Sequence, residues 1–394
     1  MTRANSGPAL LVALAIAGLL AVPAAAQQFQ SGAMPVTIAQ FEQILESSKG
    51  ARDADLARKL SGVTLTERAG SAQLSAWQKE FPGKRTREVL IALSDLSAFR
   101  TLPATDLPSE PPPPIEMQRT IFARAVDYVV KPQPRLPDFS AQRSTTRFEI
   151  ASRVVFDSLR HTSGLSAAAG EQASYRVLGP VRPGPGGGQW LYISATSSHV
   201  VTYRDGSEVT DKAPPANKFQ LKSLNQPLST VGEFGPILGV VIGDSVHSSV
   251  TWSHWERDGD RTLAILKYAV PASKSHYEVL SSALGDSQTA AYHGEIAVDP
   301  ETGTIYRIML LSDPGTPEVP ESAIVVDYGP MEIAGQTYTC PIRSIALSRT
   351  SVQSIYKAVE ATDFTSLNDV TFTNYHVFRT KVLILPETGA AAPQ

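Results

Sequence analysis

The sequence predicts an α+β protein, with a small N-terminal helical domain, a proline-rich linker, and then a large curved antiparallel β-sheet. That sheet is expected to be half-barrel-like, with covering helices. Hydrophobic residues recur at every third or fourth position up to about residue 100, and at every second position after about residue 144. Between the two patterns lie prolines that interrupt both helices and central strands.

The first 26 residues have the pattern of a secretory signal peptide. Arg3 supplies a positive charge, residues 9–22 form an apolar stretch, and Ala24 and Ala26 place small side chains before the expected cleavage point. The apolar stretch is shorter than the roughly 20 residues that cross a bilayer. We therefore expect cleavage after Ala26, export to the periplasm or cell envelope, and no transmembrane span in the mature chain.

Residues 27–101 are expected to form the helical domain. Thr37 with Gln40, and Thr64 with Glu67, have the spacing of capping boxes, in which a hydroxyl and a longer side chain satisfy free amides. Short helices with one apolar face each are predicted from residues at helical spacing, namely Ile38, Phe41, Leu45, Leu56, Leu60, Val63, Leu74, Trp77, Phe81, Val89, Leu93 and Leu96.

Residues 102–115 are expected to be a linker. A proline run favours a stiff, extended conformation, and its commonest use is as a spacer. The next expected domain is residues 116–385, which begins with one helix over about 116–130 and continues with the sheet. Residues 386–394 are expected to be a disordered tail.

The alternating region predicts roughly ten strands. Asp258-Gly259-Asp260 is a strong hairpin signal because glycine tolerates the positive φ of a tight turn, and residues 299–303 form a longer hairpin loop. Strands joined by short turns must be antiparallel. The apolar segment near residues 234–246 is expected to be helical and to lie across one face of the sheet as a lid.

The charge balance and the motifs exclude several classes of function. Lysine and arginine number 35 against 38 aspartate and glutamate residues, so there is no electrostatic case for nucleic-acid binding. The seven histidines show no metal-ligand spacing, and no cofactor motif is present. The single cysteine, Cys340, cannot form an internal disulfide, and its surroundings predict a buried apolar role.

Catalysis is not indicated by any complete motif. Gly243-Asp244-Ser245, with His247 close by, resembles the serine block of one hydrolase class, but no matching aspartate–histidine pair occurs near the C-terminus. Serine hydrolysis through Ser245 and His247 is therefore the weakest of three hypotheses. The sequence favours non-catalytic binding and leaves the question of enzymatic activity open.

Aromatic side chains of the strand region are the candidate lining of a ligand groove, namely Trp252, Trp255 and Tyr268. Strict alternation would place Trp252 on one face of its strand with His254 and Glu256, and Trp255 on the other. One indole would then belong to the core and the other would line a groove or meet a partner.

Two stretches resemble known exported proteins. Residues 292–299 (YHGEIAVD), followed by Thr302-Gly303, and residues 326–341 are similar to segments of exported proteins from Acidobacteria-like bacteria. The strand–TG–strand pattern, over roughly 250–380, also resembles the outer-membrane lipoprotein-sorting (LolA/LolB-like) superfamily. That resemblance implies an open half-barrel, lidded by helices, that holds acyl chains. The N-terminal helical region has no counterpart in that superfamily.

The leading hypothesis is a periplasmic or cell-envelope protein that shelters an apolar ligand, such as a lipid or a lipoprotein acyl chain. The alternative is a structural or protein-interaction component of an envelope assembly, which would use the helical domain and the linker to reach an envelope partner.

Overall fold

The computed structural model describes residues 33–131, 136–153, 155, 171–182, 188–204, 207–209, 228, 233–280, 287–313, 320–351 and 363–377. All of them belong to one compact unit, residues 31–394. The expected signal peptide and the expected C-terminal tail lie outside the described residues.

The N-terminal part is helical, as the sequence predicts, and also contains two short strands. Its elements are β1 (Met34–Val36), α1 (Ile38–Glu46), α2 (Asp53–Ser61), β2 (Val63–Leu65), α3 (Ser71–Glu80) and α4 (Lys84–Ser97). The capping box at the start of α1 is confirmed, because the Gln40 amide donates to Thr37 Oγ1 at 3.2 Å and the Thr37 amide donates to Gln40 Oε1 at 2.9 Å.

The second expected capping box is wrong. Thr64 lies in β2, which pairs in parallel with β1 and holds this segment extended. Glu67 instead accepts a hydrogen bond from the Ile38 amide at 2.8 Å, so it satisfies the first turn of a different helix. The spacing is correct for a helix start, but pairing with Pro35, 29 residues upstream, holds the backbone of Thr64 extended.

The proline-rich segment leads into α5 (Ile115–Val130), close to the expected boundaries of 116–130. A single 3₁₀ turn, η2 (Ala104–Asp106), interrupts its extended course. Proline at the start of a helix costs no hydrogen bond, since the first amides have no partner within the helix, and Pro114 occupies the N-cap of α5.

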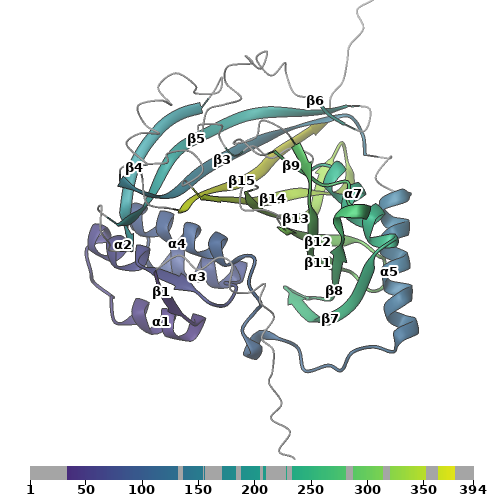
Figure 1. Ribbon diagram of the computed structural model, residues 1–394, viewed down its shortest axis with the longest axis horizontal. Coiled ribbons are helices and arrows are strands. Elements are labelled where there is room, and N and C mark those ends of the chain that lie inside the picture. Colours follow the sequence, from purple (N-terminus) through teal and green to yellow (C-terminus); the bar gives the residue numbers. More distant parts are fainter. Residues whose placement is uncertain are drawn as a thin grey trace, which may run out of the picture. The chain divides into compact units, whose positions relative to one another are not determined.

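A large antiparallel sheet follows, and it is not closed into a barrel. Across the described residues its strand order is β4-β5-β3-β15-β14-β13-β12-β11-β8-β7, with β6 paired to β5 (Figure 1). The predicted α+β class with a large antiparallel sheet is therefore confirmed. The strands of this sheet are β3 (Phe139–Ser152), β4 (Glu171–Arg182), β5 (Gln189–Arg204), β6 (Ser207–Val209), β7 (Ser249–Asp258), β8 (Arg261–Val270), β11 (Ala291–Val298), β12 (Ile305–Asp313), β13 (Glu321–Ile333), β14 (Gln336–Ser351) and β15 (Asp363–Val377).

Between β8 and β11 lie a 3₁₀ turn, η6 (Ala272–Lys274), and a separate small hairpin of β9 (Glu278–Leu280) and β10 (Ser287–Thr289). The expected hairpin between β7 and β8 is present, and Gly259 adopts the positive φ of +59° that its turn requires. Register shifts in the β13–β14 and β3–β5 pairs mark β-bulges, through which these long strands continue.

One face of the sheet, called here the α7 face, is covered by α5 and by α7 (Pro236–Val246). Side chains that alternate along β8, β11, β12 and β13 point toward the two helices. The buried members of this core include Ile121, Leu238, Val241, Ile242, Leu266, Tyr268, Tyr292, Ile296, Ile308, Leu310 and Val326.

A second buried cluster lies around the strands β3, β5 and β15. Phe139 stacks on Tyr203 at 5.0 Å between ring centroids, and Phe234 meets Phe372 edge-on at 5.0 Å. Cys340 belongs to this cluster and is fully buried, as its sequence context predicts. Burial raises the pKa of the Cys340 thiol to about 12.

The opposite face of the sheet, called here the N-terminal face, carries an ion network that joins it to the N-terminal elements. Glu256 of β7 accepts hydrogen bonds from Arg68 at 2.5 Å and from Arg307 at 2.7 Å. Arg343 donates to Asp95 of α4 at 2.5 Å and to Asp369 at 3.0 Å. The ion network consists of Arg68, Asp95, Glu256, Arg307, Asp327, Arg343 and Asp369.

Candidate functional site

Helix α7 is an apolar helix with one charged residue, Asp244. Pro236 starts it in the first turn, where a missing amide proton costs nothing. Leu238, Val241 and Ile242 are each 2% exposed or less and fill the space between α7 and the sheet. The predicted helix across one face of the sheet is thus confirmed for residues 236–246, and its inner side is packed with its own side chains.

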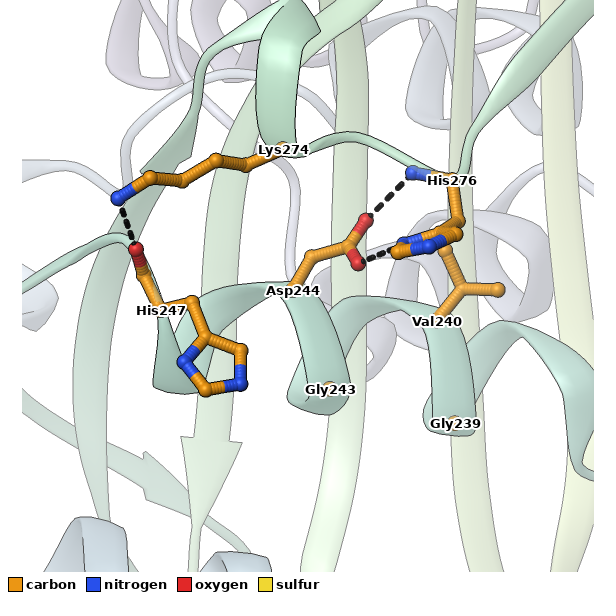
Figure 2. A pocket seen from close by; sticks show the side chains of 7 residues that line it. All are labelled: Gly239, Val240, Gly243, Asp244, His247, Lys274 and His276. Atoms are coloured by element: carbon orange, nitrogen blue, oxygen red, sulfur yellow. Dashed lines mark hydrogen bonds and ion pairs between the residues drawn. The ribbon is translucent and has the colours of Figure 1, made fainter.

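An open pocket lies along the outer part of α7. Figure 2 shows that it is shared between α7 and the segment that leaves η6. Its wall along α7 is apolar and its rim carries ionisable side chains; the lining consists of Gly239, Val240, Gly243, Asp244, His247, Lys274 and His276. A Cβ atom built at Gly239 or at Gly243 would meet no atom within 4 Å, so packing does not require glycine at either position.

Asp244 is the polar centre of the pocket, and three donors hold it. The His276 amide donates to Oδ2 at 2.8 Å, the His276 Nδ1 atom lies 2.6 Å from Oδ1, and the Tyr292 hydroxyl donates to Oδ2 at 2.8 Å. Burial by itself raises the pKa of Asp244, but the hydrogen bonds from His276 and Tyr292 outweigh it and lower that pKa below its usual value. Asp244 is therefore an ionised, fully engaged carboxylate at neutral pH.

The last turn of α7 is tied to the same segment by a lysine. The Lys274 ammonium donates to the backbone carbonyl of His247, the residue that ends the helix (Figure 2). A cation at the C-terminus of a helix is favourable because the free carbonyls there carry partial negative charge. The side chains of Lys274 and His247 are exposed.

The arrangement can position a ligand by an apolar wall and a polar rim. His276 has its Nδ1 directed at Asp244, which fixes the orientation of the imidazole and leaves Nε2 at an exposed ring edge. Because Nδ1 donates to the Asp244 carboxylate, Nε2 of the neutral ring can accept a hydrogen bond from a bound group, and the doubly protonated ring can donate one. No serine, threonine or cysteine side chain is part of the described lining.

Ser245 and His247, the residues of the weakest sequence hypothesis, are not brought together. Ser245 is 1% exposed, and its hydroxyl has no hydrogen-bond partner among the described residues. His247 is exposed and caps the end of α7. This geometry does not support a serine nucleophile activated by His247.

Trp252 and Trp255 lie on the same face of β7, and the expectation of strict alternation is wrong. The register of β7 against β8 shifts between Trp252 and His254, so a bulge at this point returns the second indole to the face of the first. The two rings meet edge-on with centroids 4.7 Å apart, and both pack against the core under α7. The Trp255 indole also donates to the Pro111 carbonyl at 3.0 Å, which attaches the proline-rich segment to β7.

Tyr268, the third residue of the sequence-based groove, is a core residue. It is 3% exposed, and its hydroxyl donates to the Met309 carbonyl at 2.8 Å. Neither Tyr268 nor the two tryptophans line the pocket along α7.

Two further properties of the described residues bear on the site. In that part of the chain, no group of three or more histidine, cysteine, aspartate or glutamate side chains is arranged to hold a metal ion. None of the described helices combines the length and the apolar composition needed to cross a membrane.

Sequence reasoning missed Lys274 and His276, since neither belongs to a motif. The available signal was on α7 itself, where Gly239 and Gly243 stand four residues apart and therefore on one side of a helix. A scan against models of known protein families, a search of curated proteins and a search of solved structures each found no match to this chain.

Proposed function

We propose that this chain is an exported protein of the periplasm or cell envelope that binds an amphiphilic ligand with an apolar chain, such as a lipid or an acyl chain, in the pocket along α7. The proposal for export rests on the pattern of the first 26 residues. The proposal for binding rests on the pocket. Its wall of glycine and valine offers an apolar surface, and its rim offers polar groups.

The single observation that carries the binding proposal is the open space above Gly239 and Gly243. Glycine inside a helix is unfavourable by about 1 kcal/mol relative to alanine, and the surrounding protein does not require it at these positions. Two such glycines beside Val240 make a smooth, shallow apolar trough in which a hydrocarbon chain can contact the backbone of α7. The ligand therefore lies outside α7, since the inner side is filled by Leu238, Val241 and Ile242.

The binding proposal is tested with a substitution that fills this trough. Gly243→Leu places a side chain in the open space, and we expect it to weaken binding of dodecyl maltoside at least about tenfold, the equivalent of roughly 1.4 kcal/mol. Isothermal titration of the purified chain, below the micelle concentration, measures this. Val246→Leu is the matched control, because Val246 is an exposed residue of the same helix that does not line the pocket.

Equal binding by the wild type and by Gly243→Leu would remove the pocket from the proposal, and no binding by either would remove the proposal itself. Export is tested separately. Expression of the full-length chain followed by fractionation and intact mass measurement should show loss of the first 26 residues and recovery in the envelope fraction. Recovery of the uncleaved chain in the cytoplasm would contradict export.

A further inference from the structure

The rim of the pocket carries a lysine with unused donors. An ammonium group has three hydrogen-bond donors, and the contact of Lys274 with the His247 carbonyl occupies one of them. Across the described residues no carboxylate lies within ion-pair distance of Lys274. Lys274 can therefore bind an additional acceptor without giving up its contact with α7.

His276 supplies a second contact point on the same side. Its side chain is 80% exposed, and only its Nδ1 atom faces Asp244. The imidazole is held in one orientation by the bond to Asp244 and by the neighbouring amide bond. Such preorganisation lowers the entropy cost of binding a group at Nε2.

Asp244 does not repel an anion as strongly as an exposed carboxylate would. Its side chain is 3% exposed, and both of its oxygens already accept hydrogen bonds from His276 and Tyr292. The partial negative charge at the end of α7 is likewise met by Lys274. The groups that remain accessible at the rim are thus the two further donors of the Lys274 ammonium and the Nε2 atom of His276, which donates when the imidazole carries a proton on both nitrogens.

The geometry points to an anionic head group on the ligand: an oxyanion, carboxylate or phosphate, that accepts a hydrogen bond from Lys274, and from Nε2 of the doubly protonated His276 ring, while its hydrocarbon chain follows Gly239, Val240 and Gly243. This inference rests on the proposed function and adds the chemical class of the head group. A free fatty acid and a phosphate-bearing lipid share this chemistry.

Four probes with the same twelve-carbon chain test the inference, namely dodecanoate, dodecyl phosphate, dodecyl maltoside and dodecyltrimethylammonium. We expect the two anions to bind about tenfold more tightly than the maltoside, because a charge-assisted hydrogen bond is the stronger kind. The ratio between dodecanoate and dodecyl phosphate distinguishes the two sources of the oxyanion. Titration calorimetry below the micelle concentration of each probe gives the affinities.

Lys274→Gln and His276→Gln should each reduce the preference for the anions, while Lys274→Arg should retain it. Lys267→Gln is the matched control, because this lysine of β8 is 54% exposed and points to the N-terminal face. Lys274→Gln, Lys274→Arg and Lys267→Gln should keep the thermal unfolding midpoint of the wild type, which shows that a change in binding does not come from unfolding. His276→Gln removes one donor to the buried Asp244, so its binding is measured at a temperature at which the variant remains folded.

Equal affinity for the maltoside and the anions, or tighter binding of the cation, would overturn the anionic head group. In that case the weaker binding of all probes by Gly243→Leu would still support the proposed function. Absence of binding by all four probes would instead refute the proposed function, and the head-group inference with it.

Discussion

The α7 pocket and the ion network lie on opposite faces of the same sheet and use charged residues in contrasting ways. In the ion network, Asp95 has a side chain with 0% exposure, and Glu256 has one with 6% exposure. At the pocket, Asp244 is equally buried, but its partner His276 is 80% exposed. An acidic group is engaged by its neighbours in both places, and only the pocket leaves the basic partner open to solvent.

The difference teaches how to separate structural charges from binding charges. Buried ions lose hydration, and their partners must replace it, so removing one partner leaves an uncompensated charge. Exposed ions keep their hydration and contribute little to stability, typically below about 1 kcal/mol. Each variant below tests whether the two faces differ in this way.

The largest effect is expected from Arg343→Met in the ion network. The change removes the cation that bonds both Asp95 and Asp369. We expect the free energy of unfolding to fall by about 3–5 kcal/mol, the usual cost of breaking a buried ion pair. Denaturant titration measures this. Asp95→Asn in the same chain should restore part of the loss, whereas a cost below about 1 kcal/mol would place the network among solvated surface pairs.

A smaller effect is expected from alanine substitutions at two glycines, one in the pocket and one in the core beneath α7. The two substitutions should change the free energy of unfolding in opposite directions. A Cβ atom at Gly294 would lie 1.8 Å from the Met309 carbonyl oxygen and 2.8 Å from the Tyr268 hydroxyl. Gly294→Ala should therefore destabilise the fold by about 3 kcal/mol. Gly243→Ala, with open space around its Cβ, should instead stabilise it by about 0.5–1 kcal/mol. Similar thermal shifts for both variants would contradict the packing described for this face.

The third expected effect is a pH dependence that belongs to the ion network. Burial raises the pKa of Glu256, but His254, Arg307 and Arg68 outweigh it and hold that pKa well below its usual range. A depressed carboxyl pKa stabilises the fold above the unfolded value of about 4.3, and this contribution is lost as the pH falls through the folded pKa. The free energy of unfolding of the wild type should therefore decrease as the pH is lowered below about 4.5. In Glu256→Gln this decrease should be smaller by about 2 kcal/mol.

Asp95, another carboxyl of the ion network, provides the control because its pKa is shifted in the opposite direction. Burial and the nearby Asp369 raise the pKa of Asp95 well above its ordinary value, although Arg343 lowers it. Protonation of Asp95 therefore favours the folded state as the pH falls. Asp95→Asn should make the loss of stability at low pH steeper, and a parallel response of the two variants would contradict the assignment.

The sequence predicted the sheet well because each strand alternates locally and each tight turn carries its own signal. Gly259 in the turn between β7 and β8 is one example, and the capping box of Thr37 is another. The second capping box failed because the partner of Thr64 is a strand distant in the chain. Strand β4 has only a weak alternating signal because Gly179 and Pro180 interrupt its pattern; a Cβ atom at Gly179 would lie 2.2 Å from Ser61 Oγ.

The site was predicted less well than the fold, for a physical reason. The bulge after Trp252 depends on the pairing of β7 with β8, and alternation alone does not encode it. The pocket arises where Asp244 meets His276, which lies 32 residues away along the chain. A short motif cannot report a contact of that kind.

The burial of Cys340 gives this protein a built-in reporter of opening. As the single sulfhydryl in the sequence, sealed among aromatic rings in β14, it is shielded from an alkylating reagent while its surroundings stay closed. Each molecule that exposes it gains one adduct of known mass. The rate of labelling therefore measures how often β14 separates from its neighbours, and no cysteine has to be introduced.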